Sequence, residues 1–122
     1  MATNFDELAG RYIAVWNETD PQRRRRAIDD LWAADARYVD PLGVAEGREA
    51  IDRMVAAVQQ QFAGMRFRVA GPVDGHHDQF RFTWELGPEG SEAPVVGFDV
   101  AVTDGDGRLR EVYGFLDRVP TA

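Results

Sequence analysis

The sequence predicts a single α+β domain in which three helices pack on a curved, mostly antiparallel sheet. Two observations indicate this fold class. Apolar residues recur every three or four positions through the first half of the chain, as in helices, and alternate with polar residues through the second half, as in strands. The chain has 122 residues and shows no internal repeat, so residues 1–122 are expected to form one domain.

Two predicted helices begin the chain. The first is expected over residues 5–17, because Asn4 can cap it and Glu7 stands at the position of a capping-box partner. The second is expected over residues 21–34, because Asp20 can cap it and a proline follows at the first helical position, where no backbone donor is needed. Both helices carry an apolar stripe that one helix face would bury.

A short strand and a third helix follow. Residues 37–40 favour a strand, which Pro41 and Gly43 are expected to stop. Apolar residues return to helical spacing over residues 48–62, and Gly64 is placed to cap the C-terminus of that helix. The helical half of the chain is therefore expected to end near Gly64.

Strands account for the second half. Gly71-Pro72 is expected to break the first of them, and the run Asp104-Gly105-Asp106-Gly107 favours a hairpin turn with positive φ. The four strands are expected over residues 65–69, 77–86, 95–103 and 108–118. One face of the second strand is polar and is expected to point outward, toward solvent or a dimer partner. That face consists of His77, Gln79, Arg81, Thr83 and Glu85.

Composition and charge exclude several classes of function. The net charge of −7 disfavours nucleic acid as a partner, because phosphate binding needs a basic surface. The chain has no cysteine, which excludes disulfides and thiolate metal sites. His76 and His77 are adjacent on a predicted strand and should point to opposite faces, so no metal site is expected. No long apolar run or basic leader is visible, so we expect a cytoplasmic protein that does not enter membranes.

Three side chains could carry chemistry. Tyr12 lies on the apolar stripe of the first helix, and is either a core tyrosine or a hydrogen-bond donor aimed into a pocket. Asp40 precedes a proline at a strand end, and is either a turn residue or a carboxylate at a pocket mouth that acts as a base. Asp99 lies in the middle of an apolar strand, where a carboxylate is disfavoured, so burial is expected to raise its pKa.

Short segments in a characteristic order resemble a known superfamily. The segments are Arg11-Tyr12-Ile13, Trp32-Ala33-Ala34-Asp35-Ala36, Asp40-Pro41-Leu42-Gly43, Gly47-Arg48-Glu49-Ala50-Ile51, Gly71-Pro72-Val73 and Asp106-Gly107-Arg108-Leu109. Together they make residues 5–117 resemble the NTF2-like superfamily, in its branch of SnoaL-like proteins and ketosteroid isomerases. The resemblance implies a cone-shaped α+β barrel, in which a bent sheet wraps around a long helix and encloses a mostly apolar pocket. It also implies a homodimer.

The resemblance further implies roles for the three candidate residues. In ketosteroid isomerases an aspartate before Pro-x-Gly shuttles a proton, while a tyrosine and a protonated aspartate form the oxyanion hole. Asp40 falls on the base, Tyr12 on the oxyanion tyrosine and Asp99 on the protonated acid. Trp32 and Val55 fall where those enzymes carry further tyrosines, so a chain of hydroxyl groups is not continued through them.

These observations predict a cofactor-independent isomerase or cyclase that removes a proton α to a carbonyl of a small apolar, steroid- or polyketide-like molecule. Asp99 is expected to be protonated at neutral pH and Asp40 to stay ionised. Two alternatives remain open, a non-catalytic ligand-binding or dimerisation module and an epoxide hydrolase that activates water with a carboxylate. A homodimer is expected to form through the outer face of the sheet. The substrate pocket is expected to be lined by Trp16, Met54, Phe80, Phe82 and Leu116.

Overall fold

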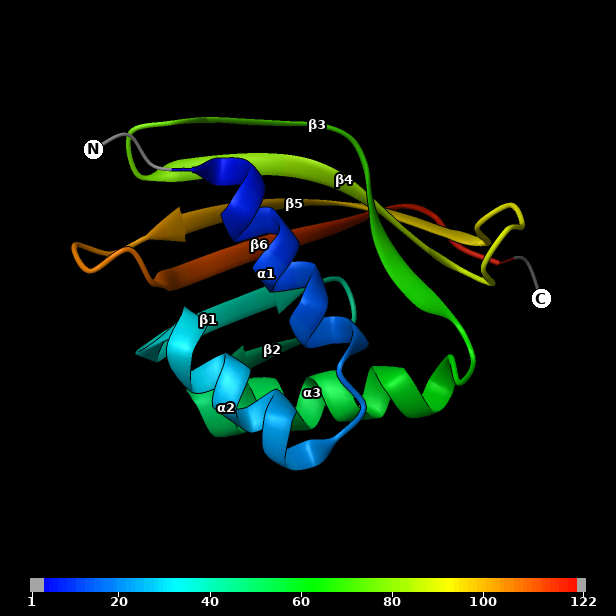
Figure 1. Cartoon of the computed structure of the whole chain (residues 1–122), viewed down its shortest axis with the longest axis horizontal. Helices are drawn as coiled ribbons and strands as arrows, with labels where there is room; N and C mark the ends of the chain where they lie inside the picture. Colours follow the sequence, from blue (N-terminus) through cyan, green and yellow to red (C-terminus); the bar gives the residue numbers. More distant parts are fainter. Residues whose placement is uncertain (1–3, 121–122) are drawn as a thin grey trace.

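The computed structural model describes residues 4–120, which form three helices and six strands (Figure 1). The predicted fold class, helices packed on a curved sheet, is confirmed. The elements in chain order are α1 (Phe5–Asn17), α2 (Pro21–Leu31), β1 (Trp32–Asp40), β2 (Gly43–Glu46), α3 (Arg48–Gln61), β3 (Arg66–His76), β4 (Gln79–Gly87), β5 (Val95–Thr103) and β6 (Leu109–Arg118).

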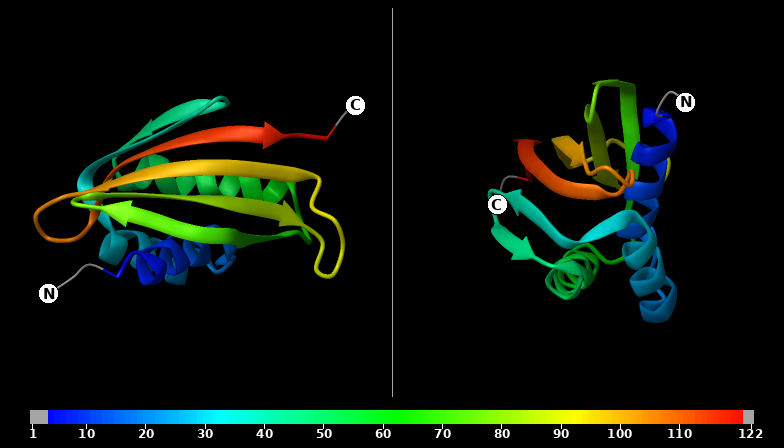
Figure 2. Two further views of the ribbon diagram at one scale, coloured as in Figure 1. Left: turned by 90° about the horizontal axis from the view of Figure 1, so that it is seen from above. Right: turned by 90° about the vertical axis from the view of Figure 1, so that its left-hand side faces the viewer.

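The six strands form one curled, open sheet in the order β2-β1-β6-β5-β4-β3. Strands β1 and β6 run parallel, whereas every other neighbouring pair is antiparallel. The helices lie against the inner side of the curl, with α1 packed on β3 and α3 packed on β1 and β2 (Figure 2). This arrangement leaves the strands of the C-terminal half to form one wall of the interior and the helices to form the other.

Side-chain caps fix the starts of the first two helices as predicted. The backbone N–H of Glu7 donates to Asn4 Oδ1 at 3.0 Å, and that of Arg23 donates to Asp20 Oδ2 at 2.9 Å. Each bond satisfies one of the donors that a helix leaves free at its N-terminus. The end predicted for the first helix, at Asn17, is also confirmed.

The region around the first strand differs from the prediction. The second helix ends at Leu31, not near residue 34, because Trp32 already pairs with Leu109 on β6 and is completely buried. The turn after Asp40 does not stop the strand but reverses it into β2, a short strand that the sequence did not predict. Tertiary pairing therefore extends strand structure into two segments whose local signals favoured the last turn of a helix and a loop.

Strand β3 continues through Gly71-Pro72, where a break was predicted. It has an irregular register between Ala70 and Asp74, which absorbs the proline and the positive φ of Gly71. Proline is tolerated at this place because β3 is an edge strand, whose outer N–H groups have no partner strand. A proline at the edge also discourages pairing with strands of other chains.

The turn between β3 and β4 lies at His77 and Asp78, so β4 begins at Gln79, two residues later than predicted. His77 has φ 55° and lies in the turn, so it does not share the strand face assigned to it. Its Nδ1 atom approaches that of His76 at 3.2 Å, so the two rings do not point to opposite faces. The other four residues of the predicted polar face are exposed or half-buried on the outer side of β4, as expected.

Closely packed aromatic rings fill one end of the interior. The rings of Phe80 and Phe82 stack with their centroids 6.1 Å apart, and Phe5 packs against Phe80 at 5.6 Å. A side chain at Gly75 would overlap the Phe5 ring, so this glycine lets α1 approach the sheet closely. The interior is thus closed at the end where β4 begins. None of the helices in residues 4–120 has the length and apolar character needed to cross a bilayer.

Candidate active site

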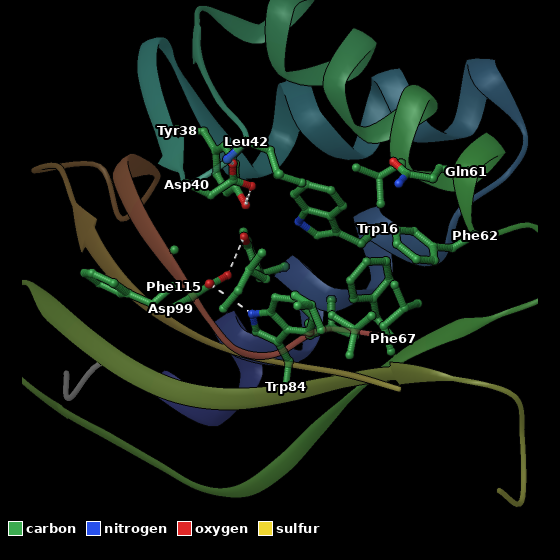
Figure 3. Close-up of a pocket in the computed structure, with 18 of the residues that line it drawn as sticks. Trp16, Tyr38, Asp40, Leu42, Gln61, Phe62, Phe67, Trp84, Asp99 and Phe115 are labelled. Atoms are coloured by element: carbon green, nitrogen blue, oxygen red, sulfur yellow. Dashed lines mark hydrogen bonds between the residues drawn. The ribbon is translucent and has the colours of Figure 1, made fainter. Parts of the chain in front are cut away.

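A cavity of about 320 Å³ opens at the other end of the interior, between the helices and the sheet (Figure 3). Most of its lining is apolar, and its polar groups come from two tyrosines, two aspartates, one glutamine and two indoles. The lining residues are Tyr12, Ile13, Trp16, Tyr38, Asp40, Leu42, Val58, Gln61, Phe62, Phe67, Trp84, Leu86, Val95, Asp99, Gly114, Phe115, Leu116, Val119 and Pro120. The cavity brings Tyr12, Asp40 and Asp99 together, although they lie on α1, β1 and β5.

Asp99 is at the centre of the sheet and its side chain is only 2% exposed. The Tyr12 hydroxyl donates to Asp99 Oδ2 at 2.7 Å, and Trp84 Nε1–H donates to Oδ1 at 2.9 Å. The alternation along β5 is as predicted, with Asp99 on the buried face. Trp84 can lie over β5 because its strand neighbour is Gly97, where any side chain would overlap the indole.

Burial raises the pKa of Asp99 from its ordinary 3.8 to about 6. The hydrogen bonds from Trp84 and Tyr12 oppose this rise in pKa, and the nearby charge of Asp40 adds to it. The predicted direction is therefore correct, but the expected protonation at neutral pH is wrong, because a carboxyl group with a pKa near 6 is mostly ionised at pH 7. Burial, followed by the charge of Asp99, raises the pKa of the Tyr12 hydroxyl well above its usual range, so Tyr12 stays a donor.

Asp40 lies at the C-terminal end of β1, where it serves both as a turn residue and as a carboxylate of the cavity. Its Oδ1 atom accepts hydrogen bonds from the backbone N–H groups of Leu42 at 2.8 Å and Gly43 at 3.1 Å. Its Oδ2 atom accepts a hydrogen bond from the Tyr38 hydroxyl at 2.8 Å. The two roles considered for Asp40, turn residue and pocket carboxylate, are thus compatible, since the hydrogen bonds that form the turn leave its carboxylate in the cavity wall.

Tyr38 is a site residue that the sequence reasoning missed. It is buried, and its hydroxyl lies near both carboxylates, whose charges add to burial in raising its pKa well above the usual range. A usable signal was present, because residues two apart on a strand share a face and Tyr38 stands two before Asp40. The sequence reasoning also missed Trp84 as a hydrogen-bond donor of the site, because its hydrogen bond to Asp99 depends on the pairing of β4 with β5.

Gly114 lies where the two carboxylates approach each other. It pairs with Asp99 across the β5–β6 ladder. A Cβ atom at this position would stand 3.0 Å from Asp99 Oδ1, 3.3 Å from Asp40 Cβ and 3.3 Å from the Tyr38 hydroxyl. The glycine therefore leaves a gap between the polar groups that any other residue would fill.

The predicted substrate-binding residues divide into two groups. Trp16 and Leu116 line the cavity. Phe80 and Phe82 do not, because they pack in the closed aromatic end of the interior. Met54 is also outside the lining, since it packs beside Gly43, and residues further along α3 reach the cavity instead.

No group of three histidine or acidic residues able to hold a metal ion occurs within residues 4–120.

The comparisons with known proteins agree with this geometry. A family model described as SnoaL-like domain matches residues 9–112. A crystal structure from Agrobacterium tumefaciens, described as a proposed isomerase of the SnoaL-like family, is 42% identical, with 93% of this chain and 97% of that chain covered and a TM-score of 0.89. No curated protein matches the sequence.

Two more distant structures share the fold alone. A proposed SnoaL-like polyketide cyclase from Jannaschia sp. CCS1 is 15% identical, with a TM-score of 0.72 over 96% of this chain and 90% of that chain. A proposed polyketide cyclase from Sinorhizobium meliloti is 19% identical, with a TM-score of 0.69 over 88% and 93%.

Proposed function

The chain belongs to the SnoaL-like domain family, and we propose that it catalyses proton abstraction α to a carbonyl of a small apolar molecule. The observation that carries this proposal is the convergence of Asp40, Tyr12 and Asp99 on one apolar cavity. An apolar site strengthens the electrostatic interactions that stabilise an enolate, and the chemistry needs no cofactor.

In the proposed reaction Asp40 is the general base. Its carboxylate takes the proton from the carbon beside the carbonyl, and the bonding electrons move onto the carbonyl oxygen. The bonds from Leu42, Gly43 and Tyr38 hold the carboxylate in one orientation. An isomerase returns this proton to another carbon, whereas in a cyclase the enolate carbon attacks a second carbonyl of the same molecule.

Tyr12 and Asp99 would stabilise the oxygen on which charge develops. Tyr12 donates its O–H, and Asp99 donates when it is protonated. An ionised Asp99 would repel the negative charge that develops on the enolate oxygen, so the reactive form of the protein is the one in which Asp99 already carries its proton. In the free protein the protonated fraction falls as the pH rises through 6.

Deuterium exchange tests the proposal without knowledge of the natural substrate. We expect the protein to accelerate exchange of the α-protons of 2-tetralone, a small apolar ketone, in D₂O followed by NMR. At low ketone concentration the rate should decline above pH 6, where Asp99 loses its proton. Binding without any exchange above the buffer rate would contradict catalysis and favour the non-catalytic binding module. The epoxide-hydrolase alternative has less support, because most of the cavity lining beside Asp40 is apolar and offers few polar groups to hold a reacting water.

We also propose a homodimer that pairs the outer faces of two sheets. On β5 and β6 this face carries Phe98, Val100 and Phe115, which pairs with Phe98, is 55% exposed and also borders the mouth of the cavity. Sedimentation at micromolar concentration should give twice the chain mass, and Val100→Glu should reduce it to the monomer. Gln79→Glu, on the polar part of the same face, is the matched control and should remain dimeric. A wild-type monomer would contradict the dimer without affecting the proposed chemistry.

A further inference from the structure

Trp16 carries a buried hydrogen-bond donor that no acceptor satisfies. Its side chain is 6% exposed, and its Nε1 atom has no hydrogen-bond partner among the described residues. Trp84, the other indole of the cavity, is satisfied by Asp99. A buried N–H without an acceptor costs about 1–3 kcal/mol, and most such groups in folded proteins are paired. An unpaired donor in the wall of a ligand cavity therefore needs a physical explanation.

Three aromatic rings pack against the Trp16 indole, and two of them, Tyr12 and Tyr38, carry a hydroxyl group. The Tyr38 hydroxyl already donates to Asp40, so we consider Tyr12. Tyr12 and Trp16 are four apart on α1 and so lie on the same face of the helix, with ring centroids 6.2 Å apart. Burial raises the pKa of the Tyr12 hydroxyl, and the Trp16 indole N–H opposes that rise from the side of the phenolic oxygen, although it does not meet hydrogen-bond geometry in the free protein. In the ligand-free geometry the Tyr12 O–H points to Asp99.

We propose that Trp16 is a positioning residue, whose indole N–H donates to the Tyr12 oxygen when a ligand oxygen draws the Tyr12 O–H away from Asp99. The donors then form a chain from Trp16 through Tyr12 to the ligand. A hydroxyl that accepts a hydrogen bond becomes a stronger donor, because the bonds polarise each other. The unsatisfied N–H of the free protein is satisfied in the complex, which favours ligands that carry an oxygen at this point. The inference rests on the proposed function, since it assumes that Tyr12 meets a substrate oxygen.

The three tryptophans of the chain allow a direct test by NMR of the indole N–H groups. Trp32 Nε1 is also buried without a partner among the described residues and lies outside the cavity lining, but its ring packs 5.9 Å from that of Tyr12, so its signal shows whether a shift is specific to Trp16 or general around Tyr12. The probes are 2-naphthol, which carries an enol-like oxygen, and naphthalene, which lacks one. We expect 2-naphthol to move the Trp16 signal downfield and to leave the Trp32 signal in place. Naphthalene should bind without the downfield shift.

The variant Tyr12→Phe separates the proposed chain from direct contact between Trp16 and the ligand. It should abolish the downfield shift caused by 2-naphthol, because the phenolic oxygen that accepts the bond is gone. Trp16→Phe should weaken 2-naphthol binding about tenfold and leave naphthalene binding within about twofold, since only the hydrogen bond is lost.

The outcomes distinguish this inference from the proposed function. If both probes bind and move the Trp16 signal equally, or if the shift persists in Tyr12→Phe, the positioning role is wrong while the apolar pocket stands. If neither probe binds, the apolar ligand site of the proposed function is wrong, and the inference falls with it. Because the decisive signals come from the wild-type protein, failure of Trp16→Phe to fold would not prevent the test.

Discussion

Asp40 and Asp99 are the same residue type in one cavity, but they are held in opposite ways. Asp99 lies in the middle of β5, and its carboxylate accepts hydrogen bonds only from side chains, those of Tyr12 and Trp84. Asp40 lies at a strand end, and its carboxylate accepts hydrogen bonds from two backbone N–H groups and from the Tyr38 hydroxyl. Burial raises the pKa of Asp99 to about 6. The position of an aspartate along a strand determines how deeply it is buried and which groups donate hydrogen bonds to it. Two identical side chains can therefore take different roles, one as an acid and the other as a base.

The largest expected effect comes from removing the base. Asp40→Asn should slow α-proton exchange of 2-tetralone by about 10²–10⁴-fold, the usual contribution of a general base. The control is Asp35→Asn, which changes an exposed aspartate on the same strand and should leave the rate unchanged. An Asp40→Asn variant that retains wild-type exchange would show that the division of roles is wrong.

The second effect concerns stability and tests the other carboxylate. A pKa of about 6 in the folded protein, against 3.8 for an ordinary aspartate, means that the folded state binds the proton more tightly than the unfolded state. The free energy of unfolding should therefore fall by about 3 kcal/mol between pH 4 and pH 6 and remain lower above pH 6. Asp99→Asn should remove this dependence.

The measurement is urea unfolding of the wild type and Asp99→Asn across pH 4–7, with Asp35→Asn as the control. The amide can accept from Trp84 and donate to the Tyr12 oxygen, so the variant is expected to fold and to keep part of its exchange activity. Parallel stability profiles for the wild type and Asp99→Asn would mean that Asp99 has an ordinary pKa.

The smallest expected effect comes from the gap between the two carboxylates. Gly114→Ala would place a methyl group 3.0 Å from Asp99 Oδ1, so the strands must shift slightly, and we expect a loss of about 1–2 kcal/mol in unfolding free energy. Exchange of 2-tetralone should fall more than stability alone explains, because the methyl group occupies space between acid and base. Gly10→Ala, on an exposed part of α1 with open space around it, should be neutral or stabilising. Equal exchange rates in both variants would show that the gap has no role.

Much of the fold and part of the site could be predicted from local patterns. Periodicity and caps located the helices, and a lone carboxylate in an apolar strand marked Asp99. The end of α2 could not be predicted, because it depends on the pairing of Trp32 with Leu109, far along the chain. The pKa of Asp99 could not be predicted either, since the two side chains that donate hydrogen bonds to it come from α1 and β4.

The extent of the cavity could not be predicted from local sequence patterns either. Phe80, Phe82 and Trp84 alternate identically along β4, and nothing in that alternation indicates which part of the strand is covered. Phe5 closes the first part by packing on Gly75, while the second part stays open. A pattern thus identifies the inner face of a strand, and the packing of a distant helix decides where that face meets a ligand.

The parallel pairing of β1 with β6 has a consequence for biosynthesis. The two strands are the only parallel neighbours in the described part of the sheet, and they are separated by most of the chain. Closing so long a loop is slow, because its entropy must be lost before the strand contacts form. During translation Asp40 leaves the ribosome long before Gly114, its neighbour in the finished cavity wall. The nascent chain can therefore form its helices and the β3–β4 hairpin early, but it can bind a ligand between the two carboxylates only after its last strand has been made.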